Sequence, residues 1–167
     1  MLMSQPGMVI DSLEFTRRHG SLSGRLQLAN LSRLRDMLFE ASGNLDFEVS
    51  GESVGREAFL ALKLDGALQL TCQRCLEALE FDISVSSRVM LIEPGMPWPD
   101  EVQIGGLEDE ACDAIEASRE LDLAPLLEEE VLLSLPLSPR HERCESPRVA
   151  VSKEVSPFAH LARLKRT

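Results

Sequence analysis

The segment LALKLDGALQLTCQRCLEALEFDISVSSRVML, residues 60–91, alternates apolar and polar residues on both sides of a short turn. Apolar residues fall at every second position before the turn and again over residues 79–85. A period of two places one face of a strand against a core, so this segment predicts two antiparallel β-strands. The turn between them contains Cys72 and Cys75.

Further strands are predicted upstream of this pair. Residues 45–49 alternate in the same way and should end in a turn at 51–55, which contains two glycines. The Asp65-Gly66 step would give a bend or a bulge in the next strand. Leu13 with Phe15, and residues 24–28, are typical of short extended segments.

Two helices are predicted. In the first, Asn30 is the N-cap, an apolar face follows and Gly43 ends the helix. That face consists of Leu31, Leu34, Met37 and Leu38. The second begins near Asp122 with Pro125 in its first turn, and Pro136 stops it. Its apolar stripe consists of Leu123, Leu127, Val131 and Leu135, flanked by Leu126 and Leu133, whereas Glu128, Glu129 and Glu130 should face water.

Charged residues are distributed unevenly along the rest of the chain, with an acidic segment followed by a basic one. The net charge is −11, and residues 89–139 hold one basic and 13 acidic side chains. Within them, residues 93–119 contain several Pro and Gly and predict a long, flexible acidic loop. Residues 140–167 hold seven basic and three acidic side chains, and 157–166 are typical of a short amphipathic helix.

Together these patterns predict an α+β fold with an antiparallel β-sheet that could close into a barrel-like form. Two main helices, a long acidic loop and a short C-terminal helix would complete it. The expected organisation is one domain over residues 1–144 and a basic tail over residues 145–167.

The composition narrows the class of protein. No apolar stretch is long enough to span a membrane and no signal peptide is visible, so we expect a cytoplasmic protein. No phosphate-binding glycine loop, GxSxG or HExxH motif occurs, which predicts no catalytic residues, no small-molecule substrate and no enzymatic activity.

The cysteines allow three interpretations. Cys72 and Cys75 have the spacing of a zinc knuckle, and His141 and Cys144 could supply the other two ligands of one structural zinc. The pair could equally be reduced thiols without a ligand. A thiol-redox role is less favoured, because redox CxxC pairs begin a helix after a parallel strand. No other cofactor is indicated.

Arg74 lies between the two cysteines, where a cation would favour the thiolate. It could also pair with Glu77, or contact a phosphate. The residues predicted to contact a partner or RNA are Arg74 and the tail residues Lys153, Arg163, Lys165 and Arg166.

Four blocks of the sequence, in order, resemble the YceD-like proteins, the large ribosomal RNA (23S rRNA) accumulation proteins. The first is LTCQRCLE at 70–77, and the second is the acidic helix of 121–131. The others are LPLSPRH at 135–141 with Cys144 following, and the terminal PFA to LKR at 157–166. Some members of that family carry further cysteine pairs after the same proline stop, whereas this chain has one His and one Cys.

The resemblance implies a non-enzymatic ribosome biogenesis factor that supports synthesis, processing or stability of 23S rRNA. The charge division suggests an adaptor whose acidic segment 93–139 engages a basic large-subunit ribosomal protein while the tail contacts rRNA. The alternatives are a direct RNA-binding module that protects 23S rRNA precursors and, less favoured, a thiol-redox protein.

Overall fold

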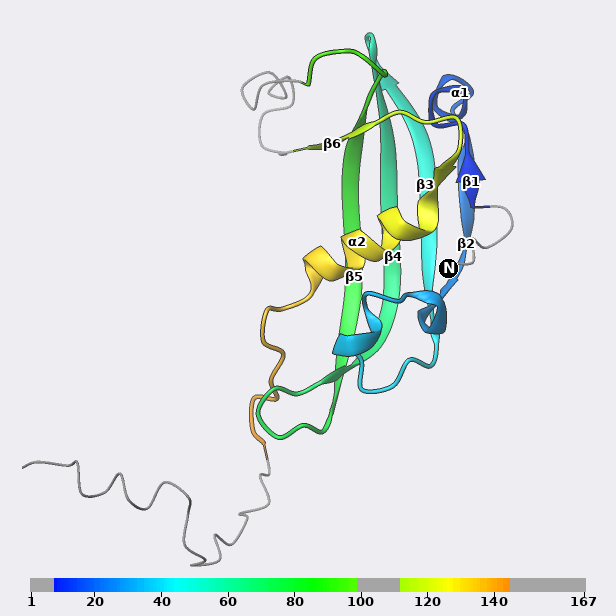
Figure 1. Ribbon diagram of the computed structural model, residues 1–167. Coiled ribbons are helices and arrows are strands. Elements are labelled where there is room, and N and C mark those ends of the chain that lie inside the picture. The colour runs from blue at the N-terminus through cyan, green and yellow to red at the C-terminus, as the bar shows by residue number, and fades with distance from the viewer. Residues whose placement is uncertain (1–7, 99–111, 145–167) are drawn as a thin grey trace, which may run out of the picture.

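A computed structural model describes residues 8–98 and 112–144 (Figure 1). The elements in chain order are β1 (Val9–Ile10), α1 (Ser12–Arg17), β2 (Ser21–Gln27), the 3₁₀ turns η1 (Leu28–Asn30) and η2 (Arg35–Met37), β3 (Asn44–Val54), β4 (Glu57–Thr71), β5 (Ala78–Ile92), β6 (Asp113–Glu116), β7 (Leu121–Asp122) and α2 (Leu123–Ser134). No helix in the described ranges is long and apolar enough to cross a membrane.

The strands form a mixed sheet in the order β2-β3-β4-β5-β6 and a small second sheet of β1 and β7. Strands β2 to β5 are antiparallel, whereas β6 pairs with β5 in parallel. The predicted antiparallel strands are therefore confirmed. Within the described residues the large sheet is open, with β2 and β6 at its edges, so the barrel-like form is not found.

The alternating pattern of β4 and β5 places one face of the sheet against the core. Leu60, Leu62, Leu64, Leu68 and Leu70 are fully buried, and residues between them are mostly exposed or half-buried. Helix α2 crosses this face over β4 and β5 (Figure 1). Its apolar stripe joins the same core cluster.

The turn predicted over residues 51–55 is confirmed only at Gly55, and the predicted bend or bulge at Asp65-Gly66 is wrong. Strand β3 continues through Gly51 to Val54, and the chain turns at residues 55–56. The ladder between β4 and β5 also runs unbroken past Asp65 and Gly66, which pair with Ser84 and Ile83. The β-ladder on both sides overrides the local preference of these residues for turns.

The segment around Leu13 and Phe15 is a helix, α1, and not the extended segment that was predicted. Its N-cap is Asp11, whose side chain accepts a hydrogen bond from Glu14 N at 3.0 Å. The N-cap bond satisfies one of the free N–H groups at the helix start, which favours a helix over a strand here.

Helix α1 packs directly on the backbone of β3 at Gly51. A Cβ atom at this position would lie 2.7 Å from Thr16 Cα and 2.8 Å from Phe15 O. These are backbone atoms, so no change of side-chain rotamer can relieve the clash. We therefore expect Gly51→Ala to reduce the free energy of unfolding by about 1–3 kcal/mol in urea titrations.

Gly24→Ala is the matched control for this prediction. Its Cβ would meet only the Phe47 ring at 3.2 Å, and that side chain can shift. Equal losses of stability in the two variants would contradict the proposed contact with α1.

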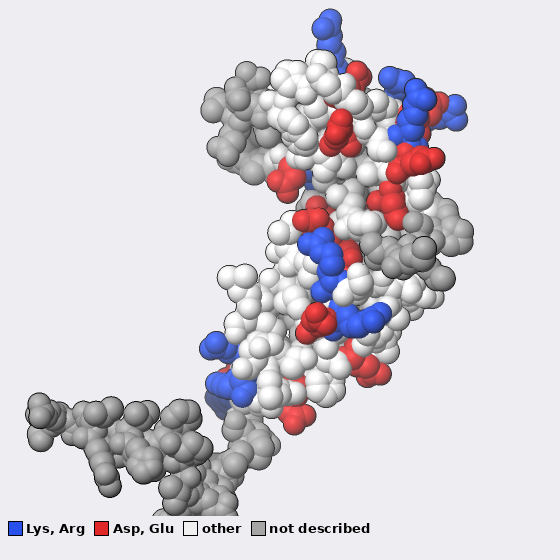
Figure 2. All heavy atoms as spheres, viewed as in Figure 1, with Lys and Arg blue, Asp and Glu red and all other residues white. Residues whose placement is uncertain are grey.

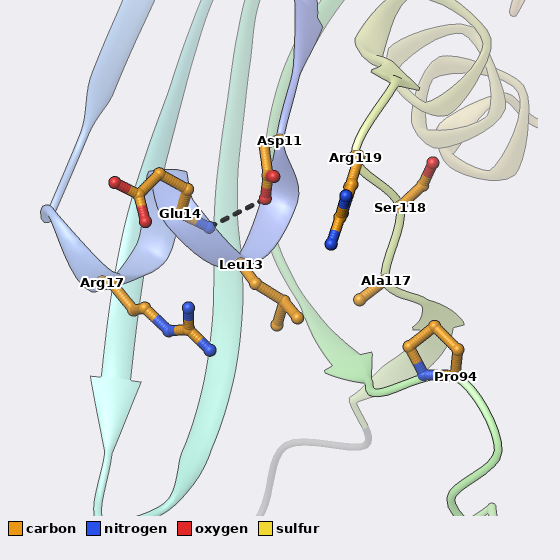
Figure 3. Close-up of a pocket in the computed structure, with 8 residues that line it drawn as sticks. All are labelled: Asp11, Leu13, Glu14, Arg17, Pro94, Ala117, Ser118 and Arg119. Atoms are coloured by element: carbon orange, nitrogen blue, oxygen red, sulfur yellow. Dashed lines mark hydrogen bonds between the residues drawn. The ribbon is translucent and has the colours of Figure 1, made fainter.

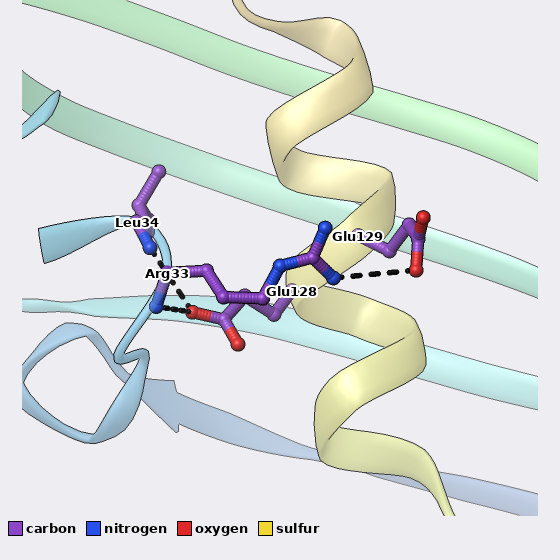
Figure 4. A network of polar contacts seen from close by, with 4 residues as sticks. All are labelled: Arg33, Leu34, Glu128 and Glu129. Carbon is purple, nitrogen blue, oxygen red and sulfur yellow. Dashed lines mark hydrogen bonds and ion pairs between the residues drawn. The ribbon is translucent and has the colours of Figure 1, made fainter. Parts of the chain in front are cut away.

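The first predicted helix, over residues 30–43, is also wrong. Its apolar residues are mostly buried, but the backbone forms the 3₁₀ turns η1 and η2. The Asn30 side chain bonds Gln27 and does not cap a helix. Instead, Glu128 from α2 accepts hydrogen bonds from Arg33 N at 2.6 Å and Leu34 N at 3.1 Å (Figure 4).

The second predicted helix is confirmed as α2, capped by the Asp122 side chain on Ala124 N. The prediction that its glutamates face water fails for two of the three. Glu128 is 4% exposed and Glu130 is 9% exposed, although the two lie on opposite flanks of the apolar stripe of α2. Leu133, by contrast, is 68% exposed.

Part of the predicted acidic loop over 93–119 is ordered structure. Residues 113–116 form β6 beside β5, and Ala117 N donates to Ile92 O at 2.7 Å. Residues 99–111 of that loop lie outside the described part of the chain. So does the predicted basic tail with its short helix, residues 145–167.

Candidate metal centre

Cys72 and Cys75 lie in the tight turn that joins β4 to β5. Cys72 N donates to Glu77 O at 3.0 Å, and Leu76 N donates to Cys72 O at 2.9 Å. These bonds hold the two thiols on the same side of the turn. Leu76 closes the turn with a φ of 63°, in the left-handed region.

Leu76 is an unusual residue for this position. A Cβ in the left-handed region costs roughly 1–2 kcal/mol, and the Leu76 side chain, 68% exposed, gains little from packing. We expect Leu76→Gly to raise the free energy of unfolding by about 0.5–1 kcal/mol, after allowing for the greater freedom of glycine in the unfolded chain.

Leu76→Ala separates this effect from the removal of an exposed apolar side chain, because alanine keeps the Cβ. Chemical denaturation of both variants should show the gain only for glycine. A similar gain for alanine would mean that backbone strain at Leu76 is not the cause.

The loop after α2 brings His141 and Cys144 to this turn. Gln73 N donates to Pro139 O at 2.8 Å, which joins the loop to the turn. The ligand atoms of Cys72, Cys75, His141 and Cys144 all lie within 4.8 Å of one another. The four residues that the sequence analysis singled out are therefore brought together.

The distances within this cluster fit a tetrahedral metal ion. Tetrahedral zinc places two sulfur ligands about 3.8 Å apart, and a sulfur and a nitrogen ligand about 3.6 Å apart. Cys72 Sγ and Cys144 Sγ are 3.6 Å apart. His141 Nδ1 lies 3.4 Å from Cys75 Sγ and 3.9 Å from Cys144 Sγ. Three sulfurs and one imidazole nitrogen are also ligands that zinc prefers.

The imidazole of His141 is oriented as in zinc sites. Its Nε2 lies 2.9 Å from Ala78 O, and donation from Nε2–H leaves Nδ1 free for a metal. A metal-bound His commonly donates its second N–H to a carbonyl in this way, which fixes the tautomer and the ring. The Ala78 carbonyl is a contact that no side-chain pattern in the sequence could indicate.

Arg74 bridges the two halves of the cluster. Its Nε donates to Cys144 Sγ at 2.8 Å and its terminal nitrogen donates to His141 O at 3.1 Å. Of the roles that the sequence left open for Arg74, the structure favours the cation that stabilises a thiolate. Three thiolates and a divalent zinc carry one net negative charge, which the Arg74 guanidinium would balance.

Two of the three thiols in the cluster, those of Cys72 and Cys144, have pKa values below the ordinary value for cysteine. Burial alone would raise the pKa of Cys72, but backbone N–H groups of Cys75, His141 and Arg74 lower it to about 5. Burial also opposes ionisation of Cys144, but Arg74 and His141 lower its pKa. The pKa of His141 is raised by Cys144 and Cys72.

Cys75 differs from the other two thiols. The backbone N–H of Glu77 favours its thiolate, but burial and the neighbouring cysteines raise its pKa overall. Metal binding would replace the remaining protons, since zinc takes thiolates and neutral imidazole as ligands.

The other predicted contact residues are not placed here. Lys153, Arg163, Lys165 and Arg166 lie outside the described part of the chain. Cys112 is apart from the cluster, and its Sγ donates to Arg88 O at 3.0 Å.

Comparison with known proteins identifies the family. The chain matches the family model described as "Large ribosomal RNA subunit accumulation protein YceD" over residues 60–165. The chain belongs to the YceD family. No curated protein and no solved structure matches it.

The region shared with YceD proteins contains the whole candidate metal centre. It begins within β4 and includes the cysteine turn, α2 and the loop that carries His141 and Cys144. Strands β2 and β3 precede it. The YceD name implies a role in accumulation of large-subunit ribosomal RNA.

Proposed function

We propose that this YceD protein is a non-enzymatic ribosome biogenesis factor that supports synthesis, processing or stability of 23S rRNA, with one structural zinc. The observation that carries the proposal is the family match over residues 60–165, which contains all four candidate ligands. The zinc would join the β4–β5 turn to the loop after α2.

The completeness of the ligand set supports a structural role for the metal. Structural zinc sites have four protein ligands, whereas catalytic sites keep one position open for water or substrate. Here four protein ligand atoms lie within 4.8 Å of one another, and the Arg74 guanidinium donates to Cys144 Sγ. A site of this kind holds two segments together and leaves no position for a reacting molecule.

The surface supports an adaptor in preference to a large RNA-binding face. On the side shown in Figure 2, acidic and basic side chains of the described residues are interspersed, with no continuous basic field. An RNA-binding domain normally presents clustered Lys and Arg. Exposed acids of the 93–139 segment, including Glu93, Glu116 and Glu120, remain available to a basic ribosomal protein.

A deletion strain tests the biological role. Loss of the protein should lower the ratio of mature 23S to 16S rRNA, and the wild-type gene should restore it. Cys72→Ser should restore it poorly, whereas Cys112→Ser should restore it fully. An unchanged 23S to 16S ratio in the deletion strain would overturn the proposed function.

Salt dependence distinguishes an adaptor from a protein that binds RNA directly. Direct contact with single-stranded RNA predicts a log–log slope of about −0.7 for each phosphate neutralised. An adaptor should instead be recovered with large-subunit proteins at low salt and bind naked 23S fragments weakly. Tight, salt-sensitive binding to naked RNA would contradict the adaptor mechanism.

A further inference from the structure

A groove far from the cysteine cluster lies between α1 and the segment that precedes β7 (Figure 3). Its volume is about 340 Å³, and Leu13, Pro94 and Ala117 supply its apolar lining. Arg17 from α1 and Arg119 from the other segment also line it. Figure 3 shows the two guanidinium groups on either side of Leu13.

The two walls of this groove are held in a fixed relation. Ser12 N and Ser12 Oγ both donate to Ser118 O, at 2.9 and 3.0 Å, and Ser118 N donates back to Ser12 Oγ at 3.0 Å. Ser12 is fully buried. Since Ser118 directly precedes Arg119, these bonds fix the position from which the Arg119 side chain extends toward the groove.

The acidic residues that line the groove are already engaged. Asp11 accepts the N-cap hydrogen bond from Glu14 N, and Glu14 forms an ion pair with Arg18. Within residues 8–98 and 112–144, no ion pair involves Arg17 or Arg119. Two guanidinium groups therefore face the groove without a carboxylate partner.

The placement of Arg119 is notable because of its surroundings in the sequence. It is the single basic residue among residues 89–139, which hold 13 acidic side chains. Folding brings this lone cation to the same groove as Arg17, which lies 102 residues earlier in the chain. A ligand group that contacts both must offer hydrogen-bond acceptors, and an anionic group forms the strongest such bonds with guanidinium.

We propose that this groove is a binding site for a phosphate group, held between Arg17 and Arg119. The planar guanidinium matches the geometry of phosphate oxygens and can form two parallel hydrogen bonds. The apolar lining would take the uncharged part of a nucleotide, such as the ribose or an edge of the base. The phosphate can belong to a free nucleotide or to an RNA backbone. The site does not depend on the proposed function or on zinc.

Titration of the full-length, ¹⁵N-labelled protein with orthophosphate, AMP and a short oligoribonucleotide tests this proposal. The Nε–H resonances of Arg17 and Arg119 should shift in a saturable way. AMP should bind more tightly than orthophosphate because of the apolar lining. Arg17→Gln and Arg119→Gln should each weaken AMP binding about tenfold, since each removes one charged phosphate contact.

Arg56→Gln is the matched control, because Arg56 is exposed in the β3–β4 turn and its replacement makes the same change in net charge. It should bind like the wild type. All three variants should keep the wild-type melting temperature, because the three arginines are exposed. Equal effects of the three substitutions, or no saturable shift of Arg17 and Arg119, would overturn the proposal.

The oligoribonucleotide separates the two sources of phosphate. If RNA is the ligand, the double variant Arg17→Gln/Arg119→Gln should reduce the salt slope of binding by about 0.7 per lost phosphate contact. Binding of AMP without binding of the oligonucleotide assigns the site to free nucleotides. A deletion strain that accumulates 23S rRNA normally would overturn the proposed function but not this site.

Discussion

Replacing Cys72 by Ser is expected to reduce bound zinc from one ion per chain to almost none. Cys72 is fully buried, and its sulfur lies 3.6 Å from that of Cys144. A serine hydroxyl is a poor zinc ligand, so three ligands would remain on two separate segments. At a thousandfold excess of zinc over Kd, bound zinc contributes about 4 kcal/mol to stability, which the variant would lose.

Native mass spectrometry and urea unfolding, each with and without a chelator, measure both effects. Cys112→Ser is the matched control, because it makes the same substitution at a cysteine that lies outside the cluster. It should keep one zinc, and chelator should destabilise it as much as the wild type. The zinc site would be contradicted if the wild-type protein bound no zinc, or if chelator left its free energy of unfolding unchanged.

The strands were predictable because their evidence is local. In β4 and β5, buried and exposed residues alternate with a period of two. The alternation from Leu60 to Leu70 is long enough to outweigh a single turn-forming residue such as Gly66. Helix α2 has equally local signals, with a capping Asp122 at one end and Pro136 at the other.

The two helix errors arose where a partner distant in sequence determines the backbone. Leu31, Leu34 and Met37 have helical spacing, but two backbone N–H groups of their segment donate to Glu128, almost one hundred residues later. At α1 the apolar residues suggested a strand, whereas Asp11 caps a helix and Gly51 makes room for it on β3. No window of sequence contains both halves of these contacts.

The candidate metal site was predictable in its ligands but not in its surroundings. The spacing of Cys72 and Cys75, and of His141 and Cys144, indicated four ligands of the right type. Two other features depend on the path of the backbone. They are the Ala78 carbonyl that orients His141, and the His141 carbonyl that accepts a hydrogen bond from Arg74. Side-chain patterns carry no information about which carbonyl will face a ring nitrogen.

Replacing Glu128 by Ala should have the largest effect on stability outside the cysteine cluster. One carboxylate oxygen accepts from two backbone N–H groups, of Arg33 and Leu34, in a position that is 4% exposed (Figure 4). Alanine would remove the acceptor of both donors, of which that of Leu34 belongs to a fully buried residue and that of Arg33 to an exposed one. A buried unsatisfied group costs about 1–3 kcal/mol and an exposed one costs less, so we expect a loss of about 2–4 kcal/mol in urea unfolding.

Two further variants determine whether the acceptor, and not the charge, carries this effect. Glu128→Gln keeps a carbonyl oxygen at the same place and should lose less than half as much stability as Glu128→Ala. Glu129→Ala removes the neighbouring carboxylate, which is 55% exposed and pairs with the Arg33 side chain at 3.3 Å. An exposed ion pair contributes about 0–1 kcal/mol, so that variant should stay close to the wild type. If Glu129→Ala lost as much stability as Glu128→Ala, the two hydrogen bonds from Arg33 N and Leu34 N would not be what holds this segment against α2. If Glu128→Gln matched Glu128→Ala instead, the contribution would come from the negative charge.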